Sequence, residues 1–168
     1  TMDIQAIRDL FDYNYWANRH LLTVAAQLTP DQFTAPSAHS WGGVEGTLVH
    51  ILDTEMGWRE LLCGRPGAPE LKPADFPTVD ALQQGWQADE QIMRAYLDGL
   101  SDADLQGIIR YHTDTGALRE RVLWHCLFHV VNHGMQHRSE VASMLTGYGH
   151  SPGDIDFTVF LNKRAGLE

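Results

Sequence analysis

Apolar residues recur at intervals of three and four along most of the chain, which is the spacing of amphipathic helices and not of strands. The pattern predicts a first helix over residues 3–28, a second over 43–63, a third from Thr78 to about residue 100, and a fourth over 118–146. Four long helices in a chain of this length favour an all-α four-helix bundle.

The segments between these helices carry their own signals. Thr29, Pro30 and Gln32 read as the cap, first residue and capping-box partner of one short helical turn. Residues 64–77 hold four prolines and two glycines, which predicts a long crossover and not a tight turn.

The region before the fourth helix suggests a short hairpin. Ile108, Ile109 and Tyr111 precede the turn-forming triplet Asp114, Thr115 and Gly116, and Leu118 follows it. After the fourth helix, Gly147 is the expected left-handed cap. The apolar positions of residues 155–161 predict a last short helix. We interpret residues 1–168 as a single domain.

Composition excludes several function classes. The chain has 168 residues, of which 43% are apolar, and its formal charge is −10. Such an acidic protein repels phosphate backbones and anionic lipid, so we expect no nucleic acid or membrane partner. No apolar run approaches the ~20 residues of a membrane span, and no leader pattern is present. We therefore expect a soluble, cytoplasmic protein. The two cysteines are too few for a disulfide framework.

Candidate chemistry lies in a row of histidines in the fourth helix. His125, His129, His133 and His137 recur every four residues, so neighbouring rings stack on successive turns and can reach one metal ion. Each step of four drifts about 40° around the axis, so at most two of them face one site. On a helical wheel His133 and His137 lie in the middle of the apolar arc, and His125 lies at its edge. His50, on the apolar arc of the second helix, is the obvious third ligand.

Buried imidazoles need partners for their ring nitrogens, and a bound cation supplies them. Three neutral nitrogens suit Zn²⁺ or Ni²⁺ and leave a fourth position open for water or substrate. Glu140 lies one turn beyond Gln136 and near His137, where it could orient a ligand, act as a base or simply form a salt bridge. Cys126 lies about two turns away, so we expect a buried, inert thiol.

Better-known helical metal motifs are missing from the row. The residues that follow the leading histidines are Cys126, Val130 and Gly134, and none is the glutamate of H-E-x-x-H. No Glu-x-x-His pair occurs in the sequence, which argues against a ferritin-like di-iron bundle.

The fourth helix is also apolar on the side away from the histidines. This second face carries Trp124, Phe128, Val131, Met135 and Ala142. A helix that is apolar on two faces is central in its fold or packs against a second chain. No helix of a four-helix bundle is central, so we expect a homodimer.

Several blocks of the sequence resemble the DinB/YfiT family of four-helix bundles. They are residues 11–18 in the first helix, 48–51 with Glu55 and Trp58 in the second, 129–133 with 137–138 in the fourth, and the tail from Pro152 to Leu161. The resemblance implies an up-down-down-up bundle, a dimer, and a Zn²⁺ or Ni²⁺ site formed by His50, His133 and His137. It also implies an activity like that of the relatives that are thiol transferases or isomerases using small cofactor thiols.

One block departs from the family pattern. Relatives often read His-Arg-Gly-Gln where this chain has His137, Arg138, Ser139 and Glu140. The difference adds an acid near the expected metal, so a relative's substrate does not transfer directly to this chain.

Three readings of the histidines follow. The leading hypothesis is a metal-dependent enzyme that activates a water or a low-molecular-weight thiol as nucleophile towards a small electrophile, as a thiol S-transferase or a hydrolase does. The second is a non-catalytic metal- or ligand-binding bundle of a stress response. The third makes all the histidines structural.

Overall fold

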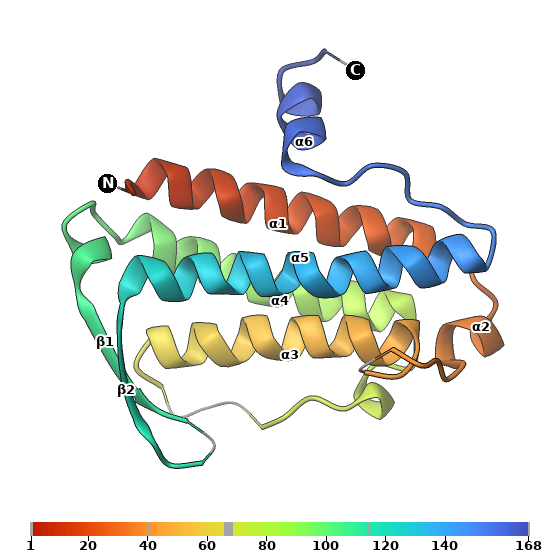
Figure 1. Cartoon of the computed structure of the whole chain (residues 1–168), viewed down its shortest axis with the longest axis horizontal. Helices are drawn as coiled ribbons and strands as arrows, with labels where there is room; N and C mark the ends of the chain where they lie inside the picture. The colour runs from red at the N-terminus through yellow and green to blue at the C-terminus, as the bar shows by residue number, and fades with distance from the viewer. Residues whose placement is uncertain (1, 40, 66–68, 114, 168) are drawn as a thin grey trace.

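Four long helices form the body of the protein. The computed structural model describes residues 2–39, 41–65, 69–113 and 115–167. The bundle helices are α1 (Ile4–Ala25), α3 (Val44–Leu62), α4 (Val79–Asp98) and α5 (Leu123–Gly147). Helices α1 and α5 run in one direction and α3 and α4 in the other, and the α3–α4 connection returns along the whole bundle (Figure 1). The predicted up-down-down-up bundle with a long crossover is confirmed.

Capping side chains fix where the helices begin. The Asp3 carboxylate accepts a hydrogen bond from the backbone N–H of Ala6 at the start of α1. Thr29 forms the expected capping box with Gln32 ahead of α2 (Pro30–Thr34). Thr78 caps α4 through the N–H of Ala81. Each cap satisfies a backbone donor that the helix leaves unpaired, and this is why the helix starts at Thr29 and Thr78 could be predicted.

Helix α5 packs against both α1 and α3, and α4 packs against the same two helices. The buried arc of α5 is therefore wide, because it faces two neighbours. Val131, expected on the outer face, is 4% exposed and belongs to the core. Phe128 and Met135 remain exposed, at 43% and 47%.

A two-stranded hairpin precedes α5, as predicted. Strand β1 (Ile108–His112) pairs antiparallel with β2 (Leu118–Val122), with Ile108 opposite Val122. The fourth helix was predicted to begin at Leu118 and instead begins at Leu123, because residues 118–122 form β2. Asp114, in the predicted turn, lies outside the described residues. The hairpin lies beside the end of α3 and the start of α5 (Figure 1).

The chain after α5 also differs from expectation in one detail. The left-handed residue is Gly149, with φ 86°, and not Gly147, which is the last residue of the helix. Helix α6 (Phe157–Arg164) then packs on α1 through Phe157 and Phe160, whose rings contact Tyr13. Two short 3-10 turns, Pro73–Asp75 and Asp104–Gln106, complete the described elements. Among the described residues, no helix combines the length and apolar character needed to cross a bilayer.

Candidate metal centre

Three histidine side chains from two helices converge at one point. His50 comes from α3, and His133 and His137 come from successive turns of α5. One ring nitrogen from each lies within 4.8 Å of the other two. The Nε2 atoms of His50 and His133 are 3.1 Å apart. We call these residues the histidine triad. The donor set suits Zn²⁺ or Ni²⁺, and the close approach of the nitrogens fits a single ion.

The triad lies at the edge of the core. His137 is 5% exposed, whereas His50 and His133 are only partly buried. On either side of His50 along α3, Leu48 and Ile51 are fully buried and hold the helix in position. An ion held by the triad would therefore have protein on one side and a route to solvent on the other.

Glu140 fixes the orientation of one triad ring. Its Oε2 lies 2.9 Å from Nδ1 of His137. A carboxylate only accepts hydrogen bonds, so Nδ1 carries the proton, which leaves Nε2 as the ring nitrogen available to a cation. Carboxylate partners of this kind hold metal-ligating histidines in place in many metalloproteins.

Burial keeps the triad ready for a cation. It lowers the pKa of His50 to about 4, and the neighbouring His137 adds to the effect. Burial likewise lowers the pKa of His133 to about 4, helped by His137 and His50. Neutral imidazoles are the form that binds metal, so His50 and His133 need release no proton at neutral pH to bind one.

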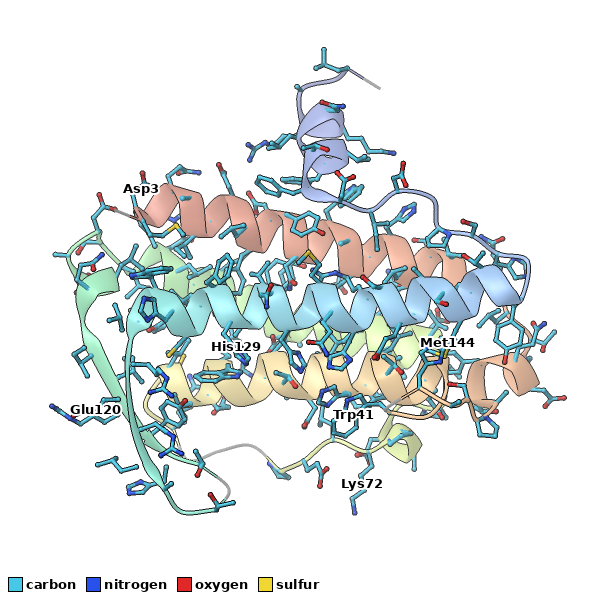
Figure 2. All side chains as sticks on the ribbon, in the orientation of Figure 1. Asp3, Trp41, Lys72, Glu120, His129 and Met144 are labelled. Atoms are coloured by element: carbon cyan, nitrogen blue, oxygen red, sulfur yellow. The ribbon has the colours of Figure 1, made fainter. Side chains whose placement is uncertain are left out.

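A row of aromatic rings extends from the triad in both directions. At one end Trp41 stacks on His50, with ring centroids 3.6 Å apart. At the other end His129 lies 5.9 Å from His133, and Trp58 lies 5.3 Å from His129. Figure 2 shows His129 towards the hairpin end, and Trp41 towards the α2 end, of the α3 and α5 pair. The triad is thus the middle of a longer aromatic surface.

Two cavities adjoin this surface. One, of about 190 Å³, lies beside His50 and is bounded by Trp41, Asp53 and the crossover residues Leu71 and Lys72. The other, of about 410 Å³, lies beside His129 at the hairpin. His125 and His129 are exposed at this second cavity and stand outside the triad, and Cys126 is buried against it.

A second polar cluster lies deeper in the bundle and was not assigned a role from the sequence. Arg138 Nη1 donates to the side-chain oxygens of Asn14 and Asn18, at 2.6 and 2.9 Å. Both amide nitrogens donate to Oε1 of Glu55, and Trp86 Nε1 donates to Oε2. We call these five residues the amide network. It joins α1, α3, α4 and α5, and the amides of Asn14 and Asn18 link its two ionisable groups, Arg138 and Glu55.

The amide network constrains α5 at Gly134. A Cβ at this position would lie 2.6 Å from Arg138 Nη1 and 2.9 Å from Asn14 Oδ1. Contacts this short are not tolerated, so glycine is needed here for packing. Gly134 lies between His133 and His137, so this close approach of α5 to the amide network occurs beside the triad.

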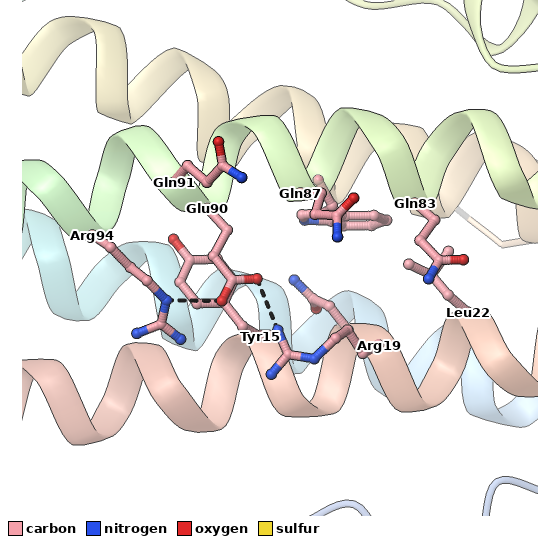
Figure 3. Close-up of a pocket in the computed structure, with 10 residues that line it drawn as sticks. Tyr15, Arg19, Leu22, Gln83, Gln87, Glu90, Gln91 and Arg94 are labelled. Carbon is pink, nitrogen blue, oxygen red and sulfur yellow. Dashed lines mark hydrogen bonds and ion pairs between the residues drawn. The ribbon is translucent and has the colours of Figure 1, made fainter.

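A cavity of about 260 Å³ lies elsewhere in the bundle, between α1 and α4. Its charged groups are already paired: Glu90 bridges Arg19 and Arg94, each at 2.8 Å (Figure 3). Tyr15 and Trp86, which are buried, form its inner wall. This cavity offers no unpaired charge for a ligand among the residues that line it.

Comparisons with known proteins support the fold and identify the family. The sequence model of the DinB family matches residues 2–165. The protein DinB of Bacillus subtilis is 23% identical over 172 residues, covering 92% of this chain and 94% of the relative. A crystal structure of a DinB-like protein from Bacillus cereus superposes with a TM-score of 0.69 at 16% identity, covering 90% of this chain and 97% of the other.

Proposed function

Because this chain belongs to the DinB family and gathers three imidazole nitrogens at one point, we propose that it is a metal-dependent enzyme. Its metal would be Zn²⁺ or Ni²⁺, and its ligands His50, His133 and His137. The observation that carries the proposal is the convergence of three imidazole nitrogens at the edge of the core, on the side that opens to solvent. Three protein ligands with an accessible fourth position are typical of catalytic sites and not of structural ones.

The reaction we propose is attack by a water or a low-molecular-weight thiol on a small electrophile. When bound, a divalent ion lowers the pKa of a water or thiol and so supplies a nucleophile at neutral pH. The chain contributes the rest: His137 is held by Glu140, and the adjoining cavities admit small molecules. We assign Glu140 as the candidate base, since it lies next to a ligand and is partly exposed.

The experiment has two stages. The purified protein is reconstituted with Zn²⁺ or Ni²⁺ and its metal content is measured, with one ion per chain expected. The loaded protein is then assayed against a panel of electrophiles with bacillithiol, mycothiol, glutathione and water as nucleophiles. Full loading with metal but no turnover with any nucleophile would contradict the proposed enzymatic function. Tight loading with a fourth protein ligand would instead favour a non-catalytic metal-binding bundle.

We also propose that the protein is a homodimer that uses the outer face of α5. Phe128 and Met135 lie two turns apart on this face, and both are large, apolar and exposed. Two large, exposed apolar side chains on one face of a helix favour an interface with a second chain. Sedimentation of the wild type and of a Phe128→Glu, Met135→Glu variant tests the proposal. A wild-type monomer would overturn it.

A further inference from the structure

The cavity beside His129 has the size and walls of a binding site for a small organic molecule. Its volume of about 410 Å³ is within the usual range for ligand pockets. Its lining residues are Trp58, Tyr111, Arg121, His125, Cys126 and His129. The Trp58 ring packs edge-on against the rings of Tyr111 and His129, at 5.4 and 5.3 Å. These rings offer an extended apolar surface to a planar ligand.

The charge of this cavity is opposite to that of the whole protein. The chain carries 22 acidic and 12 basic residues, yet the cavity lining holds an arginine and no carboxylate. Arg121 forms no ion pair within the described part of the chain, and its Nη1 donates only to the carbonyl of Glu120. By contrast, both arginines of the α1 and α4 cavity are paired with Glu90.

Two further observations place the Arg121 guanidinium at the cavity. Burial raises the pKa of the Cys126 thiol, and the positive charge of Arg121 partly offsets this effect. In the hairpin register Arg121 is opposite Ile109, on the same face as Tyr111, whereas Arg110 and Glu120 pair on the other face. The first turn of α5, which forms part of the wall, also has no acidic residue and no side-chain cap.

We propose that this cavity binds a planar or aromatic carboxylate, with its acid group on Arg121 and its body against Trp58 and Tyr111. The inference rests on the proposed function in one respect, which is that the far end of the ligand reaches the triad. His129 connects the two sites, and His133 lies eight positions after His125 on α5, about 12 Å along the axis. The substrate class is thus an elongated aromatic acid with its reactive group remote from the carboxylate.

The test uses naphthalene-2-carboxylate and the uncharged naphthalene-2-carboxamide as probes, with binding to the metal-free protein measured by calorimetry. We expect the carboxylate to bind about tenfold or more tightly than the amide, since a charge-assisted hydrogen bond is lost with the amide. Arg121→Gln should remove this preference. Arg110→Gln is the matched control, because it removes the same charge from the opposite face of the same hairpin. Trp58→Leu should weaken both probes.

Three results would overturn the inference: no binding of either probe, equal binding of the two, or equal losses in Arg121→Gln and Arg110→Gln. The unfolding temperature of each variant checks that it is folded. His133→Ala separates this inference from the proposed function, because it should lose the metal and keep the carboxylate probe. Probe binding in a wild-type protein that takes up no metal would contradict the proposed function alone.

Discussion

The histidine triad and the amide network are neighbours in the bundle, since His137 and Arg138 are adjacent on α5, but they satisfy their polar atoms in different ways. In the amide network both oxygens of Glu55 accept hydrogen bonds from within the chain. In the triad, ring nitrogens of His50 and His133 face each other. A buried carboxylate with both oxygens satisfied by donors of the chain stabilises a fold. Ring nitrogens that face one another are suited to a shared cation. Mutations in the two regions should therefore have different consequences.

The largest effect is expected in the amide network. Glu55→Ala leaves three buried donors without an acceptor and removes an acidic group that interacts with the Arg138 charge, so it should lower the free energy of unfolding by about 3–5 kcal/mol. Denaturant titration of the metal-free protein measures this loss. Glu45→Ala, on the same helix, is the control and should cost about 0.5 kcal/mol. A loss below about 1 kcal/mol for Glu55→Ala would show that the network is not structural.

The next effect is the loss of metal-dependent stability in the triad. With metal at a hundred times its Kd, the wild type should gain about 2.7 kcal/mol, or roughly 5–10 °C in Tm for a chain of this size. His133→Ala should abolish this gain, while its metal-free stability changes little compared with Glu55→Ala. Thermal melts with and without Zn²⁺ or Ni²⁺ measure both. His125→Ala should keep the full metal-dependent gain in stability. If this variant loses the gain, the wrong histidines are assigned as ligands.

A smaller effect is expected where the triad receives support from its own helix. Glu140→Gln retains an oxygen that accepts from His137 Nδ1 but removes the negative charge, so metal affinity should fall about 10- to 100-fold. Competition titration with a chelator measures the change. Glu120→Gln, exposed on the hairpin, is the control and should have no effect on affinity. If the two variants bind metal equally well, Glu140 does not support the site.

The same comparison explains what could be predicted from the sequence. The triad could be predicted because His133 and His137 are one turn apart on an apolar arc, and His50 is on another such arc. The amide network could not be predicted, because Asn14, Glu55 and Arg138 are far apart in sequence and polar residues usually indicate an exposed face. The spacing of Asn14 and Asn18, on the same inward face as Phe11, was the signal available for part of it.

The fold was predictable to the same extent. Caps at Thr29 and Thr78 are local, and the boundaries they set are confirmed. The predicted start of α5 was wrong by five residues. Residues 118–122 form a strand because they pair with β1, and not because of their own preference. The hydrophobic pattern of a short segment does not distinguish a strand from the first turn of a helix.

The smallest expected effect is the pH dependence of the free energy of unfolding, to which the triad and the amide network contribute differently. In the unfolded chain His50 and His133 titrate near pH 6.5, whereas burial lowers the pKa of each to about 4 in the fold. Between these values the unfolded state binds more protons, so the metal-free protein loses stability as the pH falls from 6.5 to about 4 and not above 6.5. Because both rings are partly exposed, we expect only about 0.5 kcal/mol per pH unit from the pair.

The amide network should act in the opposite direction. Burial raises the pKa of Glu55, so the folded state takes up this proton before the unfolded state does and gains stability as the pH falls towards 4.5.

His133→Gln removes one of the titrating rings and should make the loss of stability on acidification shallower, as denaturant titrations at pH 7, 6 and 5 would show. Gln136→Asn, a non-titrating and exposed change on the same helix, should keep the wild-type slope. An unchanged slope in His133→Gln would mean that burial of the triad does not hold its imidazoles in the neutral form, and the argument for a ready-made cation site would lose its electrostatic support.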